Sequence, residues 1–201
     1  SDESRGLGDV YKRQMNGELD FEEALCERVA LLKGLPIETI QKVYKNRITF
    51  MPGGAVLVAT MRAHKGYTAL VSGGFIDFTQ LVAAKLGFNE HRANTLLRAN
   101  DALTGQVGTP ILGREAKVTA LNEISAAQDL KRNDVLAVGD GANDLGMLQL
   151  AGTGVALHAK SIVQDQVSVR VNHGDLTALL YLQGYLKSEF VAPPSIQDGA
   201  N

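Results

Sequence analysis

The chain has 201 residues, 45% of them hydrophobic, and a formal net charge of −2. This length suits one domain with a real core, or a core with a small appended domain, and the charge gives no indication of nucleic acid or an anionic membrane as a partner. No apolar run approaches the ~18 residues of a membrane helix, and no signal peptide opens the chain, so we expect a cytoplasmic protein.

The first third of the chain has the periodicity of helices. Apolar residues on one face predict a helix over 20–33, and the single cysteine, Cys26, is expected to be a buried thiol within it. A second short helix is predicted to begin at Pro36, and a third to run over 53–66.

From residue 67 onward, short apolar strands alternate with helices. Strands are predicted at "YTALV", "DVLAV", "TGVALH" and "VSVRV", a hairpin around Asn100 and Asp101, and helices over 76–86, 114–128 and 175–185. This alternation is typical of βαβ units, so the fold class is predicted to be α/β, with a doubly wound parallel sheet. Ligands of such sheets bind beyond the carboxyl ends of the strands, so we expect the functional side chains in the residues that directly follow each strand.

A hydroxyl and two glycines follow the first predicted strand. Ser72, Gly73 and Gly74 precede a helix, and such a loop can donate several hydrogen bonds to a phosphate oxygen. The alternative is an ordinary tight turn, because glycine enables turns generally.

Two acids flank a loop almost without side chains after the second predicted strand, in "VLAVGDGANDLGMLQLAG". Asp140 lies at the tip of the strand and Asp144 four residues later. Mg²⁺ typically takes one or two protein carboxylates together with water and substrate phosphate, which fits this arrangement. Asp144 has an alternative role as the N-cap of the following helix.

Two cations are further candidates. Lys117 lies early in the helix predicted over 114–128, where a cation opposes the helix dipole, and this favours a ligand-facing role over that of a solvated lysine. Arg28 lies on the first helix and is either a bidentate group for a carboxylate or a solvated neighbour of Glu27.

These motifs together resemble a known family. The segments "VSGGF", "GREAKVTAL" and "VGDGANDLGML" are similar to the second, third and fourth motifs of the haloacid dehalogenase-like phosphatases, in the family's order. The segment "MNGELDFEEALCERVALLKGLP" resembles the helical cap of members that hydrolyse O-phosphoserine. The resemblance covers about residues 15–189 and implies the HAD-like, Rossmann-like core with a small helical cap.

The resemblance also implies roles for individual residues at the phosphoryl group. Ser72 and the Gly73 amide would bind the phosphoryl oxygens. Lys117 would neutralise the charge that develops on them, and Asn143 would add a hydrogen bond. The implied reaction is Mg²⁺-dependent conversion of O-phosphoserine to serine and phosphate, the last step of serine biosynthesis, through an aspartyl-phosphate intermediate.

Roles at the metal and at the substrate's carboxylate follow in the same way. Asp140 would ligate Mg²⁺, with Asp144 supporting the loop from just outside the metal's own ligands. Arg28, on the cap, would hold the carboxylate of the substrate, and Met15 and Phe21 would help to close the pocket.

The sequence departs from the family at its beginning. The first motif, an apolar strand ending in Asp-x-Asp-x-Thr or Asp-x-Asp-x-Ser, supplies the nucleophile and general acid in relatives, and no such motif occurs in the chain. The corresponding strand is the middle one of the family's sheet, so its absence leaves two neighbouring strands unpaired. We therefore expect the chain to be poorly ordered alone and inactive.

The expected organisation is a non-family segment over 1–14, a remnant of the helical cap over 15–48, a HAD-like α/β core over 49–190 and a flexible tail over 191–201. Two alternative functions stay open. One is a phosphatase or phosphotransferase acting on another small phosphomonoester. The other is a fragment that binds phosphate or Mg²⁺ without turnover.

Overall fold

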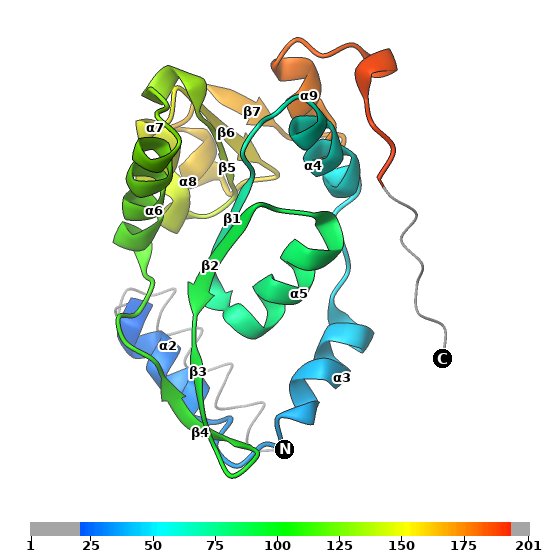
Figure 1. Cartoon of the computed structure of the whole chain (residues 1–201). Helices are drawn as coiled ribbons and strands as arrows, with labels where there is room; N and C mark the ends of the chain where they lie inside the picture. The colour runs from blue at the N-terminus through cyan, green and yellow to red at the C-terminus, as the bar shows by residue number, and fades with distance from the viewer. Residues whose placement is uncertain (1–20, 194–201) are drawn as a thin grey trace.

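The computed structural model describes residues 21–193 (Figure 1). Its upper part is an α/β layer structure, and its lower part holds two helices and a hairpin. The segments predicted over 1–14 and from Met15 to Asp20 lie outside the described residues, as do the last eight residues of the predicted tail.

The upper part is built on a three-stranded parallel sheet in the order β5–β6–β7. The strands are β5 (Leu136–Gly139), β6 (Thr153–Leu157) and β7 (Val169–Val171). One face is covered by α6 (Arg114–Ala127), α7 (Leu145–Leu150) and α8 (Ser161–Gln164), the other by α4 (Gly54–Ala63) and α9 (Ala178–Leu182). The predicted doubly wound α/β class is therefore confirmed.

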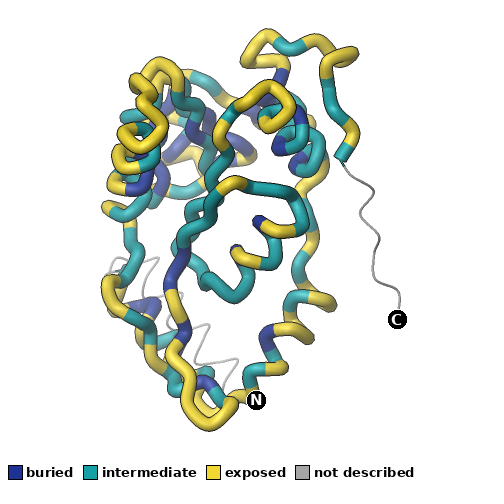
Figure 2. The backbone as a smooth tube through the Cα atoms, in the orientation of Figure 1, coloured by how far each residue is buried: buried dark blue, intermediate teal, exposed yellow. Residues whose placement is uncertain are grey.

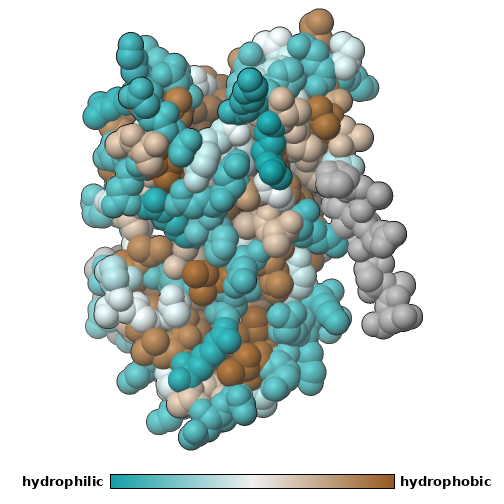
Figure 3. Space-filling view, viewed as in Figure 1, coloured by the Kyte–Doolittle hydropathy of each residue, from teal (hydrophilic) through white to brown (hydrophobic). Residues whose placement is uncertain are grey.

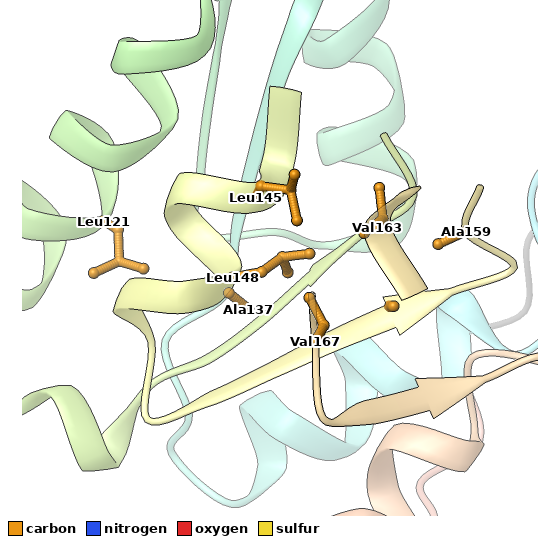
Figure 4. Close-up of a cluster of buried hydrophobic side chains, with 8 residues drawn as sticks. Leu121, Ala137, Leu145, Leu148, Ala159, Val163 and Val167 are labelled. Atoms are coloured by element: carbon orange, nitrogen blue, oxygen red, sulfur yellow. The ribbon is translucent and has the colours of Figure 1, made fainter. Parts of the chain in front are cut away.

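The side chains of β6 alternate between the two apolar layers of this core. Ala156 contacts the cluster beneath α6 and α7, which also contains Leu145 and Leu148 (Figure 4), whereas Val155 and Leu157 contact the cluster beneath α4 and α9. A strand with helices on both faces is expected to be apolar throughout, as "TGVAL" nearly is.

A second parallel pair joins β1 (Ala69–Phe75) to β2 (Glu90–Asn94) through α5 (Ile76–Leu86). Strand β1 continues through the "SGG" segment, with a change of register between Val71 and Phe75, so the predicted end at Val71 is wrong. Strand β2 was not predicted, because "EHRAN" contains no β-branched residue and reads as a charged turn.

The lower part contains α2 (Phe21–Ala30), α3 (Glu38–Arg47) and the hairpin of β3 (Leu96–Ala99) with β4 (Ala102–Val107). The predicted turn is confirmed, because Asn100 and Asp101 both have positive φ. Cys26 is exposed on α2, so its predicted burial is wrong. Figure 3 shows hydrophobic side chains at the surface of this lower part. Leu31, Leu35 and Leu97 are exposed. None of the helices within residues 21–193 has the length and apolar character of a membrane span.

The start of α9 is fixed by a side chain. Asp175 Oδ1 accepts hydrogen bonds from the Thr177 backbone N–H at 2.8 Å and from the Thr177 hydroxyl at 2.5 Å. These bonds, that from the hydroxyl first, lower the pKa of Asp175. A carboxyl group with a lowered pKa stabilises the fold above its unfolded pKa of about 3.9, and this contribution is lost as the pH falls through the folded pKa.

Replacing Asp175 with Ala is therefore expected to lower the free energy of unfolding at pH 7 by about 1 kcal/mol. The difference from the parent chain should shrink at pH values below about 3.9. Urea unfolding at pH 7 and pH 3 measures both effects, with Asp165→Ala, an exposed acid after α8, as the control. An equal loss at the two pH values would contradict the assignment.

Candidate active site

The loop that follows β5 is organised around one buried carboxylate. Asp144, 3% exposed, accepts hydrogen bonds at Oδ2 from the backbone N–H groups of Asp140 (3.1 Å) and Gly141 (3.0 Å). Asp144 occupies the N-cap position of α7, as the alternative predicted, but its side chain makes no capping hydrogen bond to this helix. The Asp144 side chain instead joins the end of the loop to its beginning, through the backbone N–H groups of Asp140 and Gly141.

The glycines of this loop are required by that closure. A Cβ built on Gly139 would lie 2.5 Å from both Cβ and Cγ of Asp144, and a Cβ on Gly141 would overlap Oδ1 of Asn143. Side chains at either position would displace the groups that the loop brings together. The bare "GDG" sequence thus allows the carboxylate to lie directly against the end of the strand.

Lys117 reaches this carboxylate from the next layer. Its Nζ forms an ion pair with Asp144 Oδ1, and the two side chains are only 12% and 5% exposed. The alternative of a solvated lysine is therefore wrong. Lys117 lies one turn into α6, and its charge is held close to the end of β5, where a charged ligand would meet the loop.

Asp140 has a different environment. It is exposed, while its backbone is fixed by the N–H bond to Asp144 and by its carbonyl, which accepts from the Lys160 N–H at 3.2 Å. No group of three or more His, Cys, Asp or Glu side chains within residues 21–193 is placed to hold a metal ion. The described residues fit Mg²⁺ if Asp140 supplies one carboxylate ligand, and water and phosphate oxygens supply the remaining ligands. Such a ligand set is usual for this ion.

The segment after Val71 lies beside α2. Ser72 Oγ accepts a hydrogen bond from the Gly74 N–H at 2.9 Å, which leaves the hydroxyl proton free to be donated to a ligand. A Cβ on Gly73 would lie 3.1 Å from the ring of Phe21, and a Cβ on Gly113, just before α6, would lie 3.4 Å from the same ring. Phe21 thus lies between the end of β1 and the start of α6.

Asn94 joins the same two segments and was missed by sequence reasoning. Its buried Nδ2 donates to the carbonyls of Gly73 (3.0 Å) and Leu112 (3.3 Å), and its Oδ1 accepts from the Leu112 N–H (2.6 Å). The sequence signal that could have identified Asn94 is a polar residue at the end of a strand. That signal was not recognised, because β2 itself was not predicted.

The structure therefore places the predicted residues in two groups joined by α6. Lys117, Asp140, Asn143 and Asp144 gather at the end of β5, and Ser72, Gly73 and Phe21 gather at the end of β1. Arg28 lies on α2 seven residues from Phe21, and its Nε donates to the carbonyl of Ala24 at 3.1 Å. Met15 lies outside the described residues.

The haloacid dehalogenase-like hydrolase family matches residues 5–149. A phosphoserine phosphatase of Streptomyces coelicolor is 38% identical, over 96% of this chain and 47% of its own. One from Streptococcus thermophilus is 41% identical, over 86% and 80%. A solved substrate-bound phosphoserine phosphatase gives a TM-score of 0.80 at 35% identity, over 88% of this chain and 83% of that chain.

The chain thus belongs to the haloacid dehalogenase-like hydrolase family. The branch of that family to which it is similar is that of the phosphoserine phosphatases, and the resemblance read from the motifs is confirmed. The chain spans about half the length of the Streptomyces relative.

Proposed function

We propose that the chain is the phosphate-binding portion of a Mg²⁺-dependent phosphomonoester hydrolase that converts O-phosphoserine to serine and phosphate in the cytoplasm. The observation that carries this proposal is the buried Lys117–Asp144 pair at the end of β5, with the exposed Asp140 carboxylate beside it. The relatives named phosphoserine phosphatase support the choice of substrate.

Each group has a part in this proposal. Ser72 Oγ–H and the Gly73 N–H donate to phosphoryl oxygens, Asn143 adds a donor, and Lys117 offsets the negative charge that grows on those oxygens. Asp144 does not touch the substrate but holds Lys117 and the loop amides in place. Asp140 would hold Mg²⁺, which supplies charge neutralisation when bound.

The aspartyl-phosphate intermediate of the proposal requires a nucleophilic aspartate. The 201 residues contain no Asp-x-Asp motif, so the chain by itself is expected to bind phosphate and Mg²⁺ without turnover. Phosphate release from O-phosphoserine, measured with the chain alone, tests this expectation. Turnover by the chain alone would contradict it, and calorimetric binding of phosphate with Mg²⁺ distinguishes a binding-competent site from an inert fragment.

The resemblance of the first helical segment to the family's cap assigns the choice of substrate to Arg28. It also assigns closure of the pocket to Met15 and Phe21. Replacing Arg28 with Ala removes the bidentate donor for the carboxylate of the substrate. The affinity of the Arg28→Ala variant for O-phosphoserine should fall roughly tenfold or more, because such a decrease corresponds to the loss of one charge-assisted hydrogen bond. Its affinity for phosphoethanolamine, which lacks the carboxylate, should stay unchanged.

Calorimetry with both ligands measures this prediction, and Arg47→Ala, which removes an exposed arginine from α3, serves as the matched control. Equal weakening of both ligands by Arg28→Ala would instead favour the alternative of a phosphatase or phosphotransferase for another small phosphomonoester.

A further inference from the structure

A buried acid that the proposed phosphate and metal chemistry does not use lies at the start of α5. Asp77 is in the first turn of that helix, two residues after β1 ends at Phe75. Its side chain is only 6% exposed, and within residues 21–193 its Oδ2 atom has no hydrogen-bond partner. Burial of a carboxylate is costly unless a charge is paired with it, so a countercharge is expected beside Asp77.

The countercharge comes from the hairpin in the lower part of the molecule. Arg98, in β3, forms an ion pair with Asp77 through Nη2 and Oδ1, and the arginine side chain is 43% exposed. Figure 2 shows β3 passing from the buried to the exposed colour towards the tip of the hairpin, and of its four residues only Leu96 is buried. Strand β3 therefore meets α5 at this point through a pair of charges, with little apolar burial of its own.

The hairpin is also joined to the segment that follows α2. The Leu103 carbonyl accepts a hydrogen bond from the Gly34 N–H at 2.8 Å, and the Leu103 N–H donates to the Leu35 carbonyl at 2.9 Å. A third bond, of 3.1 Å, runs from the Ile37 N–H to the Asp101 carbonyl. The segment after α2 thus pairs with β4 as a neighbouring strand would, which fixes the end of α2 to the hairpin.

Helix α2 itself packs closely on β4. A Cβ built on Gly105, which has φ of +79°, would lie 2.9 Å from Cβ of Lys33 and 3.2 Å from the carbonyl oxygen of Ala30. The apolar face of α2 and the hairpin share one buried cluster, which includes Leu25, Val29, Leu96 and Leu103. Residues 21–37 and 96–107 therefore form one packed body, which we call the α2–hairpin body.

The ion pair gives this body a direction that its apolar contacts do not. Phe75 and Phe78, from the end of β1 and from α5, pack against the same buried cluster. Apolar contact is not directional and permits sliding, whereas an arginine–carboxylate pair has a defined geometry. Since Asp77 is buried, a displaced Arg98 would leave its carboxylate without a countercharge. The pair therefore favours one position of the α2–hairpin body against α5.

We infer that Asp77 and Arg98 are positioning residues, which hold the α2–hairpin body over the end of β1 and thereby set the place of Arg28 on α2. The Phe21 ring at the start of α2 lies against Gly73, so a shift of the body moves α2 relative to the donors assigned to phosphate. The part that Arg28 plays at a substrate carboxylate rests on the proposed function, whereas the position of α2 does not.

Two nitroxide labels measure the position of α2 in the full chain. Cys26, the single cysteine, is exposed on α2, and Ile162→Cys adds a second label at an exposed position on α8. Pulsed electron paramagnetic resonance should give one narrow distance. Asp77→Leu combined with Arg98→Met should widen the distribution and add a population at another distance. This double variant should still fold, because apolar residues in place of a buried ion pair commonly leave stability unchanged or higher.

Control variants separate positioning from a general loss of structure. Arg98→Lys, which keeps the positive charge, should retain the narrow distance. Arg92→Met removes an arginine whose ion pair with Glu123 joins β2 to α6, and it should also leave the distance unchanged. Labels on Cys26 and on Gln106→Cys, an exposed site on β4, should report the same distance in every variant. A distribution like that of the parent chain in the double variant, or a changed distance within the α2–hairpin body, would overturn the inference.

Calorimetry distinguishes the inference from the proposed function. The double variant should bind O-phosphoserine about tenfold more weakly than the parent chain, because a misplaced Arg28 loses one charge-assisted contact. It should bind inorganic phosphate with Mg²⁺ as the parent chain does, because Ser72, Gly73 and Lys117 stay in place. Equal weakening of both ligands would contradict a positioning role. If the parent chain binds neither ligand, the proposed function fails, and the label distances alone decide the inference.

Discussion

Replacing Lys117 with Met is expected to lower the free energy of unfolding by about 3–5 kcal/mol, because it leaves the Asp144 carboxylate buried without its countercharge. Both side chains of the pair are nearly covered, at 12% and 5% exposure, so water cannot replace the lost ammonium group. The two N–H groups that also contact Asp144 offset only part of the loss. Urea unfolding of the variant measures the change.

A double-mutant cycle separates the ion pair from the rest of the site. The variant that combines Lys117→Met with Asp144→Asn should be less destabilised than the sum of the two single variants, because no unpaired charge then remains. Lys42→Met, which removes an exposed lysine from α3, is the matched control and should change stability by at most about 0.5 kcal/mol. A Lys117→Met variant as stable as the control would contradict the interpretation of the pair.

Replacing Gly154 with Ala is expected to be similarly damaging for a steric reason. Gly154 lies in β6, where α7 crosses closely, and a Cβ there would lie 2.7 Å from the carbonyl carbon of Leu148 and closer still to its oxygen. These are backbone atoms, so relief requires α7 to move as a whole. A loss of about 3 kcal/mol or more is expected, at the upper end for overpacked cores.

The matched control is Gly184→Ala. Gly184 has φ of +88° and no atom within 4 Å of a built Cβ, so its substitution costs only the backbone strain of about 1 kcal/mol. Thermal or urea unfolding compares the two. Because α7 begins directly after Asp144, the Gly154 variant should also bind phosphate with Mg²⁺ more weakly, and the Gly184 variant should not. Equal stability of both variants would contradict the close packing of α7 on β6.

Much of the fold could be predicted because its signals are local. The helix over 76–86 ends at Gly87 as predicted, since a positive φ there favours glycine, and the hairpin at Asn100 and Asp101 has the residues that its turn requires. Strand β2 lacked such a signal. Its position depends on pairing with β1, from which it is separated in the sequence by the eleven-residue helix α5. No local pattern in "EHRAN" indicates this pairing.

The candidate site was predictable in its residue types but not in its contacts. The acids and glycines of the loop after β5 indicated a metal and phosphate site, and the early position of Lys117 in α6 indicated a charged partner. That this partner includes Asp144 depends on the packing of α6 against α7 and the turn before it, which brings together residues 27 positions apart. Asn94 could not be assigned for the same reason, because its partners come from two distant segments.

The three hydrogen bonds of Asn94 have a consequence for motion. They fasten the backbone at Gly73 to that at Leu112, just before α6, so the end of β1 and the start of α6 are held as one rigid unit. We therefore expect the donors of Ser72 and Gly73 and the charge of Lys117 to keep nearly the same spacing when a ligand binds. The entry and departure of a ligand are then expected to depend on displacement of α2, whose Phe21 ring packs against this unit.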